Sequence, residues 1–129
     1  MALLVAASLL TAGCAFNLAD VTYTPSAPLE PATSNESFTL DADVRIDRAP
    51  CNYDRVLKAG TRWETVGSLP EGQVFRSRDQ VLTLECSNVF EAYPIVAQAR
   101  IVAFYLPVER AIVKIPRPVP LPAQTATKE

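Results

Sequence analysis

Strict alternation of apolar and polar residues is the pattern that most limits how this chain can fold. Between Phe38 and Asp47, every even-numbered position is apolar and every odd-numbered position is polar or charged. A period of two is that of a β-strand with one face in a core, so these residues predict one long strand. The aspartates of its polar face also fit calcium chemistry. We favour a solvated face, because the run lacks calcium-loop spacing and Arg45 can neutralise its neighbours.

The rest of the central region has the composition of further strands separated by turns. Helical periodicity is nowhere sustained for the ten or more residues that a helix requires. We therefore expect an all-β domain over residues 37–115, built as a small antiparallel β-barrel or sandwich. Its other strands are expected at Thr61–Gly67, Gln73–Ser77, Val81–Cys86, Asn88–Ala97, Arg100–Leu106 and Ala111–Ile115.

The most apolar of these stretches predict a hairpin. Asn88–Ala97 and Arg100–Leu106 are separated by only two residues, which is a common hairpin spacing. The second arm is apolar enough to be buried on both faces. Pro94 has no N–H for a ladder, so the first arm is expected to be an edge strand or to carry a bulge there.

One phrase of the sequence resembles a known architecture. Residues 58–77 contain a glycine, a strand, the turn Leu69-Pro-Glu-Gly72 and a second strand, which is similar to the repeating hairpins of bacterial SH3-like barrels. The resemblance covers under a fifth of the chain and implies an SH3-like architecture, without implying an activity.

Proline-rich segments flank the predicted domain on both sides. Residues 14–36 contain little apolar material and are predicted to form an extended N-terminal tether. Residues 116–129 form a Pro-rich tail, which is expected to be extended over Pro116–Pro122 and disordered after it. That proline stretch is either a docking strip or spacer, or simply a C-terminal tail, and the sequence leaves both open.

The first thirteen residues have the pattern of a signal peptide. Residues 2–10 are apolar but far shorter than the ~20 residues that cross a bilayer. The next residues, Leu10-Thr-Ala-Gly-Cys14, resemble the bacterial lipobox. This resemblance implies removal of residues 1–13 and lipidation of Cys14, with palmitate among the acyl chains. Because Ala15 rather than Asp follows the cysteine, it also implies the outer membrane. The alternative is a buried N-terminal helix that ends in Gly-Cys.

The two remaining cysteines predict a disulfide. If Cys14 is lipidated, Cys51 and Cys86 allow one connectivity. Export places them in an oxidising compartment, where a bridge forms and persists. Such a bridge would stabilise the domain by roughly 3 to 4 kcal/mol. The alternative is two free thiols in a reducing compartment.

Composition excludes most catalytic chemistry. The chain has no histidine, so it has no histidine-based triad and no histidine-ligated metal. The carboxylates are scattered, and no nucleophile or phosphate-loop motif occurs. We therefore expect no enzyme activity, no metal and no cofactor. The net charge of −2 gives no excess of basic residues of the kind that nucleic-acid binding requires.

Aromatic side chains are the remaining candidates for a functional surface. Trp63, Tyr93 and Tyr105 either fill the core or, where one is exposed, mark a contact with a partner or ligand. From all these features we expect a lipid-anchored structural or interaction component of a bacterial cell-envelope assembly, on the periplasmic side of the outer membrane, with a protein partner. The alternative is a periplasmic ligand-binding or inhibitory lipoprotein.

Overall fold

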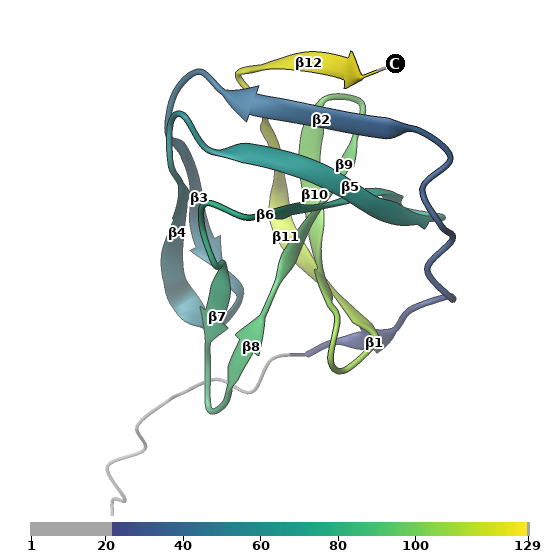
Figure 1. Ribbon diagram of the computed structural model, residues 1–129. Helices are drawn as coiled ribbons and strands as arrows, with labels where there is room; N and C mark the ends of the chain where they lie inside the picture. The colour runs from purple at the N-terminus through teal and green to yellow at the C-terminus, as the bar shows by residue number, and fades with distance from the viewer. Residues whose placement is uncertain (1–21, 129) are drawn as a thin grey trace, which may run out of the picture.

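The protein is all-β, as predicted. The computed structural model describes residues 22–128, and these contain one short 3-10 turn and no α-helix. Figure 1 shows the elements in order. The strands are β1 (Thr24–Pro25), β2 (Asn35–Leu40), β3 (Val44–Ala49), β4 (Tyr53–Leu57), β5 (Arg62–Leu69), β6 (Gly72–Ser77), β7 (Thr83–Glu85), β8 (Val89–Glu91), β9 (Tyr93–Ala97), β10 (Arg100–Leu106), β11 (Ala111–Pro120) and β12 (Ala123–Lys128), with the turn η1 (Pro50–Asn52) between β3 and β4.

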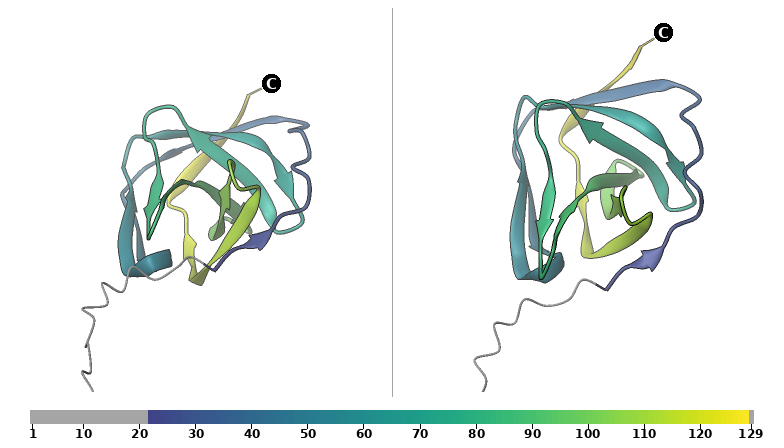
Figure 2. Two further views of the ribbon diagram at one scale, coloured as in Figure 1. Left: turned by 90° about the horizontal axis from the view of Figure 1, so that it is seen from below. Right: turned by 60° about the horizontal axis from the view of Figure 1, so that its bottom comes forward.

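Eight of the strands form one antiparallel sheet. Its order is β1-β11-β10-β9-β6-β5-β2-β12, and the remaining strands form two separate hairpins, β3-β4 and β7-β8. The sheet curls strongly, with the two hairpins beside it (Figures 1 and 2). Its two end strands, β1 and β12, do not pair with each other, so the barrel-like sheet is not closed.

The main core lies between the curled sheet and the two hairpins. The sheet contributes Trp63 and Phe104, which are almost completely buried, and the hairpins contribute Ile46 and Leu84. Phe38 packs between two aromatic neighbours, with its ring 4.8 Å from that of Phe75 and 6.4 Å from that of Trp63. Because the hairpins supply part of this core, they are integral to the domain.

A second, smaller core covers the other face of the sheet. Val74, Ile95 and Tyr105 are buried there, and Leu29 from the N-terminal segment packs against them. The backbone of Glu30 exchanges two hydrogen bonds of 2.9 Å with Ser68 on β5. Residues 26–30, the N-terminal strap, are therefore part of the fold. The strap lies within the segment predicted as an extended tether over residues 14–36, and one apolar side chain and a backbone bridge attach this part of it to the sheet.

The alternating run from Phe38 to Asp47 is not one strand. It breaks between β2 and β3, which belong to different sheets. At the break, the Asp43 carboxylate accepts a 2.7 Å hydrogen bond from the Ala59 backbone N–H, and Ala42 is exposed. The break spans three residues, so the apolar positions on both sides still face the same core.

The predicted hairpin is formed by β9 and β10. Gln98 and Ala99 both have positive φ, as a tight two-residue turn requires, and β10 is largely buried on both faces. The expectation at Pro94 is wrong, because β9 lies between β6 and β10. Its ladder with β6 stops at Ile95, so no bond to β6 is needed from the proline, and the bulge lies on β10 after Ile101.

The C-terminal segment also belongs to the sheet. β11 continues through the proline stretch to Pro120, and Leu121 donates a 3.0 Å hydrogen bond from its backbone to Ala99. β12 then pairs along the whole of β2. The boundary predicted at residue 115 and the disorder predicted after residue 122 are therefore wrong. Long-range strand pairing, which local composition does not report, orders this segment.

Candidate functional site

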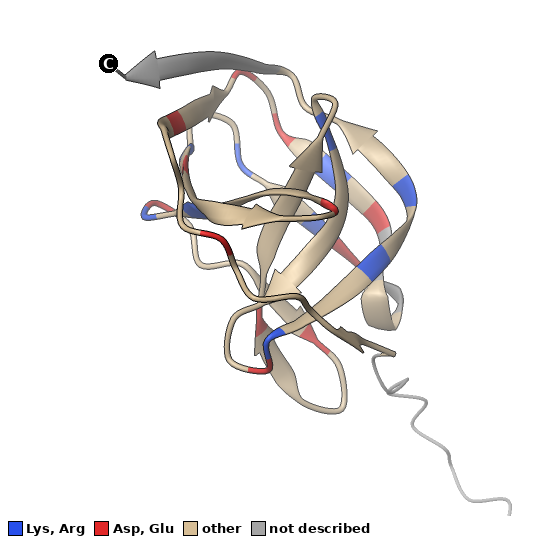
Figure 3. Cartoon of the chain, turned by 90° about the vertical axis from the view of Figure 1, so that its right-hand side faces the viewer, with Lys and Arg blue, Asp and Glu red and all other residues tan. Residues whose placement is uncertain are grey.

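Charges of both signs are interspersed over the side of the molecule seen in Figure 3. Most ion pairs in the described part of the chain join exposed side chains, and the shortest join Arg45 to Asp47 and to Asp54, both at 3.5 Å. Exposed pairs of this kind contribute little to stability, because water screens them. Recognition by the described part of the chain would therefore depend on local shape and a few side chains rather than on a broad electrostatic field.

A break in the β10–β11 ladder lies beside a groove on the described part of the protein. Ile101 pairs with Val119, but Ala103 pairs with Lys114, so residues 115–118 have only Val102 opposite them. Pro116 and Pro118 have no N–H to donate, which makes this the stretch of β11 where leaving the ladder costs least.

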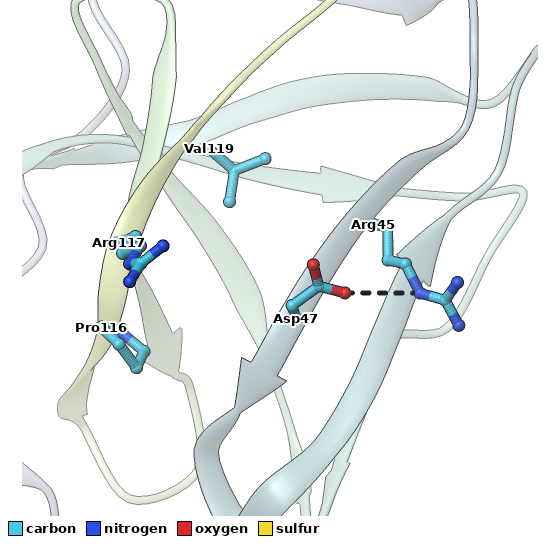
Figure 4. A pocket seen from close by; sticks show the side chains of 5 residues that line it. All are labelled: Arg45, Asp47, Pro116, Arg117 and Val119. Carbon is cyan, nitrogen blue, oxygen red and sulfur yellow. Dashed lines mark ion pairs between the residues drawn. The ribbon is translucent and has the colours of Figure 1, made fainter.

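The groove lies between this stretch and β3. It has a volume of about 510 Å³ and is lined by Arg45 and Asp47 from β3 and by Pro116, Arg117 and Val119 from β11. Figure 4 shows the two sets of side chains on opposite walls, with the Arg45–Asp47 ion pair on one of them. β3 pairs only with β4 in the part of the chain that the structure describes, so its other edge, which faces β11, has no strand partner.

Arg117 is the side chain in the groove best placed to bind a partner. In the described part of the chain, no carboxylate lies within ion-pair distance of its guanidinium, whereas Arg45 has two acidic neighbours. An arginine presents a planar fork of donors that suits carboxylate groups. Together with the unpaired edge of β3, it could hold an extended acidic segment.

Of the three aromatic residues predicted either to fill the core or to contact a partner, Trp63 lies in the core. Its side chain is 1% exposed, and its Nε1–H donates a 2.9 Å hydrogen bond to the Thr61 hydroxyl. Tyr93 is half-buried and Tyr105 is buried, with their ring centroids 6.4 Å apart. Burial raises the pKa of Tyr93; a hydrogen bond with Arg76 opposes this rise, and a hydrogen bond with Glu91 adds to it.

Tyr105 also borders a second hollow, of about 460 Å³, beneath the N-terminal strap. Its other lining residues are Ser26, Ala27, Pro28, Leu29 and Arg110. None of the three predicted aromatic residues is among those that line the groove between β3 and β11. A contact of Tyr93 or Tyr105 with a ligand stays a prediction.

The predicted disulfide is confirmed. Cys51 in η1 is bonded to Cys86, which follows β7, with their Cα atoms 5.4 Å apart. Leu82, Leu84 and Cys86 all point into the core, as their alternation indicates. The bridge therefore fastens the two hairpins to each other at one end of the molecule.

The remaining predictions concern lipidation and metal binding. Cys14 and its lipidation lie outside the described residues. Within residues 22–128, no cluster of acidic or cysteine side chains could hold a metal ion, and no helix there has the length and apolarity to span a bilayer.

Sequence reasoning missed the groove as a unit. It placed Arg45 and Asp47 on a polar strand face and left Pro116–Pro122 as either a docking strip or spacer or a simple tail, but nothing local to either segment indicates that they face each other. Comparison with protein-family models, curated proteins and solved structures finds no match to this chain.

Proposed function

We propose that this protein is a lipid-anchored structural or interaction component of a bacterial cell-envelope assembly, held on the periplasmic side of the outer membrane through Cys14. The Cys51–Cys86 disulfide is the observation that carries the proposal. Structural disulfides persist in oxidising compartments and are rare in the cytosol, which agrees with the lipobox-like leader.

The groove between β3 and β11 supplies a site for the partner. An extended acidic segment would run along the unpaired edge of β3 and meet Arg117 on the opposite wall. Mainly charged and proline side chains line the groove, and no residue in it has the arrangement of a nucleophile with a base. Binding is therefore the activity that this site supports.

Anchoring is tested on the protein purified from its native membranes. Intact-mass analysis should find residues 1–13 removed and acyl chains on Cys14, and the protein should partition into detergent. Cys14→Ser should leave the leader uncleaved and the chain without acyl groups. A native protein that keeps Met1 and a free Cys14 thiol would contradict the proposal.

Partner binding is tested separately by cross-linking in intact envelopes. Arg117→Ala should remove the cross-linked complex, whereas Arg78→Ala, which changes another exposed arginine outside the groove, should leave it unchanged. Equal complex formation by both variants would exclude the groove as the docking site.

The alternative is a periplasmic ligand-binding or inhibitory lipoprotein. The hollow beside Tyr105 favours it, since a volume of about 460 Å³ lies within the range of ~300–1,000 Å³ that is usual for small-molecule pockets. Native mass spectrometry discriminates the two proposals. A stoichiometric small ligand on the purified protein would support the alternative, and a ligand-free protein recovered in a large envelope complex would support the first.

A further inference from the structure

Three of the four large exposed apolar side chains in the described residues lie at one end of the molecule. The large exposed ones in the described chain are Tyr23, Val81, Val89 and Val108. Val89 follows the turn of the β7-β8 hairpin, and Val108 lies in the turn between β10 and β11. Both turns, together with the start of the described chain, are at the lower end in Figure 1, and Figure 2 (left) looks onto this end.

The start of the described chain is fixed at this end by several contacts. The ring of Tyr23 meets Phe90 of β8 edge to face, with centroids 6.1 Å apart. Thr24 pairs with Ile112 of β11, and the Ser26 N–H donates a 3.0 Å hydrogen bond to the Arg110 carbonyl. Tyr23 therefore lies between the two turns that carry the exposed valines.

The length of chain before this point limits how far the end can stand from an anchor. Seven residues separate Cys14 from Thr22, and a fully extended chain of that length spans at most roughly 30 Å. If Cys14 is acylated, this end of the domain is the one held nearest to the bilayer.

We propose that Tyr23, Val89 and Val108 form a membrane-facing end that rests in the interface of the bilayer, an inference that builds on the lipid anchor proposed above. Tyrosine suits the interface, since its ring is apolar and its hydroxyl stays wet. Residues 83–91 and 107–110 carry three glutamates and a single basic residue, Arg110, so attraction to anionic lipids is not the source of binding. The occupant is a zwitterionic lipid surface, contacted through apolar side chains.

This orientation gives the hairpins a specific role. The disulfide joins η1 to the end of β7, next to the turn that presents Val89. It thus holds the membrane-facing turn rigidly against the rest of the domain. The groove between β3 and β11 then keeps a fixed orientation relative to the bilayer.

The test uses the acylated full-length protein in phosphatidylcholine vesicles. An environment-sensitive fluorophore is attached through Val89→Cys or Val108→Cys, and quenchers are placed on the lipid acyl chains. Val81→Cys is the matched control, because Val81 and Val108 are both 78% exposed but Val81 lies before β7, at the open end of its hairpin. We expect quenching at positions 89 and 108 to be several-fold stronger than at position 81.

The outcomes separate this inference from the anchor itself. Protein that floats with the vesicles through acylated Cys14 but shows equal quenching at all three positions would overturn the membrane-facing end and leave the anchor standing. Protein that neither carries acyl chains nor floats would overturn the anchor, and this orientation with it. Stronger quenching at position 81 would show that the opposite end faces the bilayer.

Discussion

Removing the Cys51–Cys86 bridge should destabilise the protein by an amount that follows from its place in the chain. The two residues are 35 positions apart, and closing a loop of that length lowers the entropy of the unfolded chain by about 13 cal/mol/K in the chain-entropy model. At 25 °C this is about 4 kcal/mol, a large share of the ~5–15 kcal/mol that a domain has. Cys51→Ala with Cys86→Ala should therefore lower the Tm by roughly 15 °C.

The assay is urea unfolding followed by the fluorescence of Trp63, the single tryptophan, which is buried in the core that the hairpins complete. The wild-type protein in reducing agent is the control, since it loses the bond but keeps both sulfur atoms. It should show nearly the same loss as the double variant. A loss below about 1 kcal/mol in both would refute the reasoning, because packing alone would then hold the hairpins in place.

Three further predictions concern the turns, the strap and Tyr93. A Cβ on Gly67 would collide with the strap, so Gly67→Ala should lower the free energy of unfolding in urea by about 2–3 kcal/mol. Gly60→Ala is the control, since a Cβ there meets open space; it should lower the free energy of unfolding by only about 1 kcal/mol, because Gly60 has a positive φ. Ala99→Gly should stabilise the protein by about 1 kcal/mol in calorimetry, because Ala99 has a φ of 59°. Tyr93 should titrate above its ordinary pKa of 10.0 in ultraviolet absorbance, and Glu91→Gln should lower that pKa. The pKa of Tyr93 is higher in the folded than in the unfolded protein. The contribution of Tyr93 to the free energy of unfolding is therefore fully present below the unfolded pKa and is lost as the pH rises through the folded pKa.

Features encoded by neighbouring residues could be predicted from the sequence. The alternation of Leu82, Leu84 and Cys86 places all three in the core, and the two residues between the apolar runs at 97 and 100 form the predicted turn. The cysteine pair follows from counting, once a third cysteine is assigned to the leader. In the first two cases the signal and the structure that it determines lie within a few positions of each other, whereas the disulfide joins residues 35 positions apart and follows only from the number of cysteines.

The change of sheet between β2 and β3 could not be predicted in this way. The apolar positions keep the same parity before and after Asp41–Asp43, so the hydrophobic pattern of a broken strand is identical to that of a continuous one. What breaks the strand is the hydrogen bond between the Asp43 carboxylate and Ala59, together with the 3.0 Å bond from the Asp41 N–H to the carbonyl of Pro122. Both partners are distant in sequence.

The same argument explains why the candidate site escaped prediction while its two halves did not. The prolines at 116 and 118 indicate only that these two positions cannot donate a backbone hydrogen bond to a neighbouring strand. This holds equally for a free tail and for a strand that leaves its ladder. In the structure this segment is a strand that leaves its ladder, because β12 pairs with β2 and the Leu121 N–H bonds to the Ala99 carbonyl. These contacts return the chain to the sheet after the prolines. The groove beside β3 is thus a consequence of pairing on either side of the prolines.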